Sequence, residues 1–258
     1  MHSPPDSEDD CTCLVLVDYD NAFPPSAELS DDEIAADFGE WLERLLSNYP
    51  AITRFDIRFY GGWYNETGLS HHGSAAARIV AYLPDFPVAT AAGKIVRGGV
   101  MLAAAPLVTS TSSPLLGSHR RRGSLPRIRL SRSPHPDNCA QADATCPAAI
   151  LKAFTKSSTR VCPSQDCSLV ASQAFITQEQ KMVDTLLSTD ILTADSSPAG
   201  FSILAVVSAD SDFLPPLLAR QQMGDIDLVQ IVPRSADASE YAIDVLRDAG
   251  VEIMEIPR

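Results

Sequence analysis

Two aspartates follow a short apolar run in the C-terminal third of the chain. Residues 201–207 predict a buried strand that stops at Ser208, and Asp210 and Asp212 come directly after it. The next segment, 213–223, predicts a helix, because its two prolines fall where first-turn N–H groups have no helical partner. In an open parallel sheet, ligands bind beyond the carboxyl ends of the strands. Two carboxylates there could share a divalent cation or a water; alternatively, Asp212 caps the helix and Asp210 is a solvated turn residue.

Further carboxylates fall at comparable places earlier in the chain. Asp18 and Asp20 end the first apolar run, 13–17, and Asp184 lies on a predicted helix that includes 181–191. Carboxylate oxygens are the ligands that hard divalent cations prefer. Hydrolysis of a phosphodiester uses such ions to activate water and to hold the leaving oxygen. If these acids converge at one sheet edge, they predict a site for a divalent cation.

The elements that must position these acids alternate between strands and helices. Strands are predicted at 13–17, 55–60, 201–207, 227–232 and 251–256, with helices after Ser30, over 181–191, 213–223 and 235–249. Ser30 with Glu33, and Thr177 with Gln180, have the spacing of a capping box. Alternating strands and helices predict an α/β fold with a parallel sheet and right-handed crossovers.

Three motifs in this order resemble the NYN domains of the PIN-like nuclease superfamily. They are Val17-Asp18-Tyr19-Asp20-Asn21, then Lys181-Met182-Val183-Asp184 with Asp190 six residues on, then Ser208-Ala209-Asp210-Ser211-Asp212-Phe213. The resemblance covers about 1–62 and 175–258. It implies a Rossmann-like, three-layer α/β/α sandwich with a central parallel sheet. The resemblance therefore predicts one NYN-like domain formed by 11–63 and 173–258, interrupted by a long basic, cysteine-containing insertion at 64–172.

The resemblance also implies an activity and a set of site residues. Many members of the family cleave RNA with magnesium or manganese, so the expected function is a metal-dependent ribonuclease. By resemblance the metal ligands are Asp18, Asp184, Asp210 and Asp212, and Asn21 positions the first loop or a phosphate. The alternative is a catalytically inactive NYN-type module that binds RNA or acts as a scaffold. Phosphatase or nucleotide-processing chemistry at the same acids is a third reading.

Several of these residues also have plain structural explanations. Asn21 could hold a local Asx turn. Asp190 lies about 240° around an ideal helix from Asp184, so both cannot face one metal. Asp190 is therefore expected to cap a helix or to hydrogen-bond a metal ligand. Lys181 could pair with Asp184, face a phosphate or be a surface lysine.

The middle of the chain, 64–172, lacks the strand–helix rhythm. Residues 88–108 are rich in small and β-branched residues and predict hairpin strands. Residues 97–160 hold ten Lys/Arg against two acids, a net charge of +8, which leaves −21 for the rest of a chain of net charge −13. A basic surface on an acidic scaffold predicts contact with a phosphate backbone, although a solubilising loop or a docking segment is the alternative. The predicted RNA contacts are Arg120, Arg121, Arg122, Arg127, Arg129, Arg132 and Lys181.

Four of the six cysteines fall in the same middle stretch. Cys139, Cys146, Cys162 and Cys167 form C-x6-C-x15-C-x4-C, in which only the last pair approaches the spacing of a structural zinc site. Structural Zn²⁺ is one interpretation; buried free thiols or a redox-sensitive loop are the others. Cys11 and Cys13 are expected in the core or at its edge. His71 and His72 are expected as an exposed loop pair.

Length and composition are those of a globular protein without a membrane span. The chain has 258 residues, 45% hydrophobic and 21% charged, which suits one large domain or a domain with an insertion. No run of about 18 apolar residues predicts a membrane span. Residues 1–10 are acidic, lack the pattern of a signal peptide and are expected to be disordered. A cytoplasmic protein without a membrane partner is the expectation, with a homo-oligomer or a protein partner left open.

Overall fold

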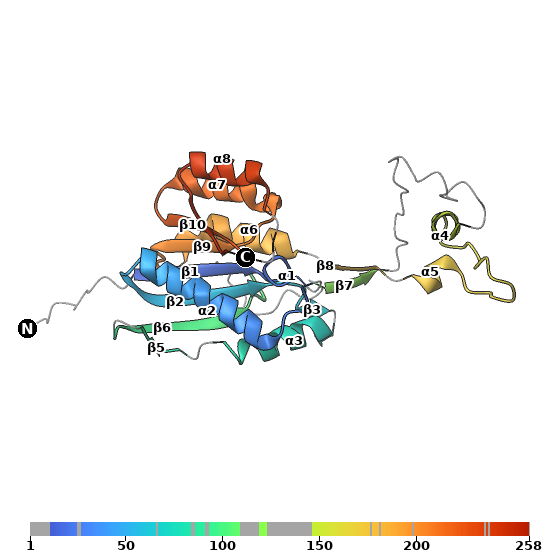
Figure 1. Cartoon of the computed structure of the whole chain (residues 1–258), viewed down its shortest axis with the longest axis horizontal. Helices are drawn as coiled ribbons and strands as arrows, with labels where there is room; N and C mark the ends of the chain where they lie inside the picture. The colour runs from blue at the N-terminus through green and yellow to red at the C-terminus, as the bar shows by residue number, and fades with distance from the viewer. Residues whose placement is uncertain are drawn as a thin grey trace, which may run out of the picture. The chain divides into compact units, whose positions relative to one another are not determined.

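A computed structural model describes most of the chain (Figure 1). The described residues are 11–24, 27–65, 67–83, 86–90, 93–108, 119–122, 146–175, 177–180, 182–197, 199–234, 236 and 238–257. Their contacts divide the chain into two compact units. Unit 1 comprises Met1–His119 with Gln180–Arg258, and unit 2 is Arg120–Glu179. The residues 1–10 lie outside the described part.

Unit 1 is built on a seven-stranded sheet. Its strand order is β11-β10-β9-β1-β2-β6-β5, and every neighbouring pair is parallel except β5 with β6. The central strand β1 is buried over nearly its whole length, as its continuous apolar run predicts for a strand covered on both faces. The strands are Cys11–Asp18 (β1), Ile52–Tyr60 (β2), Val88–Ala89 (β5), Ile95–Leu102 (β6), Ile203–Val207 (β9), Asp227–Val232 (β10) and Glu252–Glu255 (β11).

Helices cover both faces of this sheet (Figure 1). Alternate residues of β1 enter two separate cores: Val15 and Val17 pack with α2 and α3, whereas Leu14 and Leu16 pack with α6, α7 and α8. The α/β class and the layered, mostly parallel architecture are therefore confirmed. The helices are Asp31–Asn48 (α2), His71–Val80 (α3), Val183–Thr193 (α6), Leu214–Met223 (α7) and Glu240–Asp248 (α8), with the short turns Tyr19–Ala22 (α1), Ala194–Ser196 and Ser211–Phe213.

One predicted capping box is confirmed and the other is wrong. At the start of α2, Glu33 N donates to Ser30 Oγ at 3.3 Å and Ser30 N donates to Glu33 Oε2 at 2.8 Å. Thr177–Gln180 instead forms the strand β8, and α6 begins after Met182, whose φ of 65° is left-handed. Because β8 pairs with β7 (His119–Arg122), its backbone groups bond across a ladder rather than capping a helix.

The segment 64–108 differs from the expected insertion. Its strand β6 pairs in parallel with β2, from Arg54 opposite Arg97 to Phe59 opposite Leu102, so it belongs to the main sheet. The predicted hairpin is present as β5 with β6. A Cβ on Gly98 would lie 2.7 Å from the Phe55 carbonyl oxygen, so glycine here permits the close pairing. A glycine that interrupts the strand pattern in the sequence is thus required here by packing. The hairpin Tyr64–Asn65 (β3) with Gly68–Leu69 (β4) and helix α3 also belong to unit 1.

Unit 2 has a small core of its own. The helix Pro147–Phe154 (α4) begins with a proline, and the Phe154 ring contacts the Phe175 ring with centroids 5.6 Å apart. The short helix Ala171–Ala174 (α5) buries Ala171. Cys162 and Cys167 lie between them, half-buried and free. In the described parts of both units, no helix combines the length and the apolar character needed to cross a membrane.

Candidate functional site

The ends of two neighbouring strands place the acidic motifs side by side. Strands β1 and β9 pair in parallel, with Val17 opposite Val207. Asp18 ends β1, and Ser208 follows β9. The two motifs are far apart in sequence, yet both lie at the carboxyl edge of the sheet, where parallel α/β folds bind ligands.

Hydrogen bonds join the two loops that leave these strands. The Ser208 hydroxyl donates to Asp18 Oδ2 at 3.0 Å, and Ala209 N donates to Asn21 Oδ1 at 2.7 Å. On the other side, Gln230 Nε2 of β10 donates to the Ser208 carbonyl at 2.8 Å. Asn21 therefore holds the first loop against the second one; its amide oxygen bonds across the site rather than forming an isolated local turn.

Asp210 and Asp212 have different structural roles. Asp210 Oδ1 accepts from Asp212 N at 2.9 Å and caps the turn Ser211–Phe213, while Asp210 N donates to Ser208 Oγ at 3.1 Å. The capping residue is thus Asp210, not Asp212 as the alternative reading expected. Asp212 is exposed, and the buried ring of Phe213 anchors the turn beneath it.

Asp184 lies in the first turn of α6 and is electrostatically linked to the other acids. The pKa of Asp18 is raised to about 7, mainly by burial and then by charge repulsion from Asp184, Asp210 and Asp20, and only the Ser208 hydroxyl opposes this shift. The pKa of Asp184 is raised by burial and then by Asp210 and Asp212. The four predicted metal ligands therefore act on one another electrostatically.

These carboxylates supply the donor chemistry of a divalent cation site but not a closed ligand cage. Oxygen ligands are what Mg²⁺ and Mn²⁺ take, and a cation would relieve the mutual repulsion that raises the pKa of Asp18. In the part of the chain that the structure describes, no three His, Cys, Asp or Glu side chains are already grouped to hold a metal. The residues fit the metal in type and charge.

Asp190 has a structural role apart from this cluster. It is fully buried, and its Oδ2 accepts from the Tyr60 hydroxyl and lies 3.2 Å from Arg58 Nε. Its Oδ1 accepts from Leu107 N at 2.7 Å. Asp190 thus ties α6 to β2 and to the loop after β6, and neither caps a helix nor supports a metal ligand.

A histidine that sequence reasoning placed in an exposed loop is part of this sheet edge. His71 and His72 begin α3, where Ser70 is the N-cap and Ser70 Oγ accepts from Gly73 N at 2.9 Å. His71 is exposed, but His72 is half-buried with its Nε2 atom 2.9 Å from Asp20 Oδ1. The serine three residues before a helical glycine was the available signal for the helix start.

The remaining predicted sites are only partly described. Arg120, Arg121 and Arg122 lie on β7 of unit 2. Cys13 is buried in the core as expected, and Cys11 is half-buried beside it. Of the four predicted zinc ligands, Cys146, Cys162 and Cys167 are half-buried free thiols. The residues outside the described part are Cys139, Arg127, Arg129, Arg132 and Lys181.

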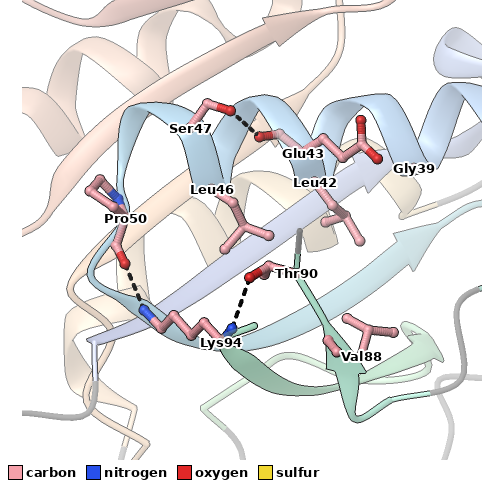
Figure 2. A pocket seen from close by; sticks show the side chains of 10 residues that line it. Gly39, Leu42, Glu43, Leu46, Ser47, Pro50, Val88, Thr90 and Lys94 are labelled. Atoms are coloured by element: carbon pink, nitrogen blue, oxygen red, sulfur yellow. Dashed lines mark hydrogen bonds between the residues drawn. The ribbon is translucent and has the colours of Figure 1, made fainter. Parts of the chain in front are cut away.

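A groove at the opposite end of the sheet does not involve these acids. It encloses about 590 Å³ between the C-terminal half of α2 and the β5–β6 hairpin (Figure 2). Leu42, Leu46 and Val88 form its apolar floor. Lys94 stands at its rim, where Nζ donates to the Pro50 carbonyl at 2.6 Å.

The candidate site is therefore the carboxyl edge of β1 and β9, flanked by the first turns of α6 and α3. Its side chains come from four segments that only the fold brings together. Comparisons of the chain with protein-family models, with curated proteins and with solved structures found no match. Function is therefore argued from the residues of this site.

Proposed function

We propose that the chain is a metal-dependent nuclease of the NYN, PIN-like type that hydrolyses phosphodiester bonds in RNA. The observation that carries the proposal is the gathering of Asp18, Asp184 and Asp210 at one sheet edge, where burial and then repulsion from Asp184 and Asp210 raise the pKa of Asp18 to about 7. A fold tolerates such repulsion where a function needs it, because perturbed carboxylates gather at functional sites.

Each side chain has a role that its position supports. Asp18, Asp184, Asp210 and Asp212 would hold one or two Mg²⁺ or Mn²⁺ ions. When bound, such an ion neutralises phosphate charge and activates water. Asn21 and Ser208 fix the distance between the two acid-bearing loops through their bonds to Ala209 N and Asp18 Oδ2.

RNA as the substrate class is supported by charge. The net +8 of residues 97–160 contrasts with the −21 of the remaining chain. A basic segment of this kind attracts a phosphate backbone and makes binding salt-dependent. The proposed contacts are the arginines of residues 120–132 and Lys181. Structural Zn²⁺ at Cys139, Cys146, Cys162 and Cys167 remains part of this proposal as a stabiliser of the same segment.

A second candidate function is an RNA-binding module without catalysis. It is favoured by one specific observation: Asp210 Oδ1 is already engaged in capping the turn Ser211–Phe213. In that case the acids would serve the local structure, and RNA would bind without a metal requirement.

Cleavage of labelled single-stranded RNA in Mn²⁺, Mg²⁺ or EDTA distinguishes the two functions. The nuclease predicts cleavage with either metal, none in EDTA, and loss of cleavage in the Asp210→Asn/Asp212→Asn double variant. A matched control is Asp227→Asn, the same chemical change at an exposed position that starts β10, at the other end of the sheet. Metal-independent RNA binding with no product at any metal concentration would favour the module. Hydrolysis of small phosphate esters alone would point to a phosphatase.

A further inference from the structure

His72 forms a buried contact with an aspartate next to the acidic cluster. Its Nε2 atom lies 2.9 Å from Asp20 Oδ1, and both atoms are shielded from solvent. Nε2 has no other partner among the described residues. A proton on Nε2 that points to Asp20 Oδ1 would therefore meet the hydrogen-bonding requirement of this buried nitrogen. Asp20 follows Asp18 by two residues and contributes to the raised pKa of Asp18. The imidazole is therefore joined to the first acid-bearing loop.

Aromatic rings fix the orientation of the imidazole. His72 stacks on the fully buried Trp63 with ring centroids 5.3 Å apart and planes at 22°, and the Tyr19 ring meets it edge-on at 5.8 Å. Helix α3 reaches this position because residue 73 is glycine: a Cβ there would lie 2.4 Å from the Trp63 carbonyl oxygen. The ring is held on two sides and has little freedom to rotate.

The second ring nitrogen is available to a ligand. The side chain of His72 is 28% exposed although Nε2 is buried. Nδ1 makes no hydrogen bond to any described residue and is not among the buried unpartnered atoms. Nδ1 is therefore accessible to solvent. A carboxylate on one nitrogen with the other nitrogen presented outward is the arrangement in which an imidazole is oriented to act on a bound group.

We propose that His72 contacts the RNA backbone at this site: Asp20 holds Nε2, and Nδ1–H donates to a phosphate oxygen of the strand. This inference rests on the proposed function. It adds His72 to the proposed RNA-binding residues, as a cationic side chain that packs on Trp63, just after β2. The Asp20 contact also raises the pKa of His72 above its usual value. The charged and titratable groups around His72 are Asp20 and Tyr19, both of α1, and His71, which precedes it in α3.

The test is the salt dependence of RNA binding, measured by fluorescence anisotropy in EDTA so that no metal-dependent cleavage intervenes. One phosphate contact contributes about 0.7 to the slope of log affinity against log salt for a single strand. At about pH 6, where His72 is charged, His72→Gln is expected to lower the slope by about 0.7 and the affinity about tenfold. At about pH 8.5 the difference should shrink. His71→Gln, in the same helical turn, is the matched control and should bind as the unaltered chain does.

The outcomes separate the inference from the proposed function. RNA binding that does not respond to His72→Gln, in a folded variant, overturns the inference alone. Absence of RNA binding by the unaltered chain in EDTA also overturns the inference, whereas the proposed function is overturned separately, by the absence of cleavage with Mn²⁺ or Mg²⁺. If His72→Gln does not fold, imidazole NMR of the unaltered chain decides, with His72 identified through single variants of the other four histidines. The Nδ1 signal of His72 must then shift with RNA; an unmoved signal overturns the inference.

Discussion

The Ser208 hydroxyl donates to Asp18 Oδ2 at 3.0 Å across 190 positions of sequence. The same hydroxyl oxygen accepts from Asp210 N at 3.1 Å. One serine thus touches two of the proposed metal-binding segments. It is fully buried, so neither bond can be replaced easily by water.

Ser208→Ala should therefore affect both loops at once. Removing the hydroxyl leaves buried Asp18 without the one contact that lowers its pKa, so this pKa should rise further. The loss of both bonds should lower the free energy of unfolding by about 1–3 kcal/mol. Urea unfolding measures the stability, and carbonyl NMR measures the pKa of Asp18. Ser202→Ala, an exposed serine just before β9, should change neither. An unchanged pKa of Asp18 would contradict the role given to Ser208.

Asp18→Asn should stabilise the metal-free protein above neutral pH. A carboxyl whose pKa is raised to about 7 in the folded state binds a proton more tightly there than in the unfolded chain. Stability is therefore lost as pH rises from the unfolded pKa through about 7, and Asn avoids that loss. The gain should be on the order of 2–4 kcal/mol near pH 8 and small near pH 4. Thermal unfolding in EDTA at the two pH values checks this.

Added Mn²⁺ provides the complementary measurement. If Asp18 helps to hold the cation, Mn²⁺ should raise the melting temperature of the unaltered chain, because a ligand that binds only the folded state stabilises it. The Asp18→Asn variant should show a smaller rise. Equal stabilisation of both proteins by Mn²⁺ would place the cation elsewhere.

The network of Asp190, Arg58 and Tyr60 should prove structural. Asp190→Asn leaves the buried guanidinium of Arg58 without its carboxylate and should cost about 3 kcal/mol of stability. Tyr60→Phe removes one donor to Asp190 and should cost less, about 1–2 kcal/mol. Denaturant unfolding ranks the two variants. Folded Asp190→Asn protein should keep the metal requirement of the unaltered chain; a changed requirement would bring Asp190 into the metal site.

The start of α2 offers a prediction on local helix chemistry. Ser30→Ala removes the acceptor of Glu33 N and the hydroxyl that donates to Glu33 Oε2, and should cost about 1 kcal/mol. Ser47→Ala, in the last turn of the same helix, is the control. Its hydroxyl only donates back to the Glu43 carbonyl, so this change should be nearly neutral. Equal effects in thermal unfolding would refute the capping role.

Local chemistry in the sequence determined the elements that carry the acids. The apolar run at β1, the capping residues of α2 and the strand 227–232 are recognisable because each depends on neighbours in the chain. The same is true of the positions of Asp18, the last residue of β1, and Asp210, which follows β9. These patterns are sufficient for the α/β class and for a candidate site at the sheet edge.

Only the tertiary structure decided which segments meet. The pairing of β6 with β2 took Ile95–Leu102 into the main sheet, and the pairing of β9 with β1 brought Asn21 to Ala209. The contact of His72 with Asp20 required α3 to pack on Trp63. Parallel pairing and helix packing depend on complementary surfaces distant in sequence, and no local periodicity records them.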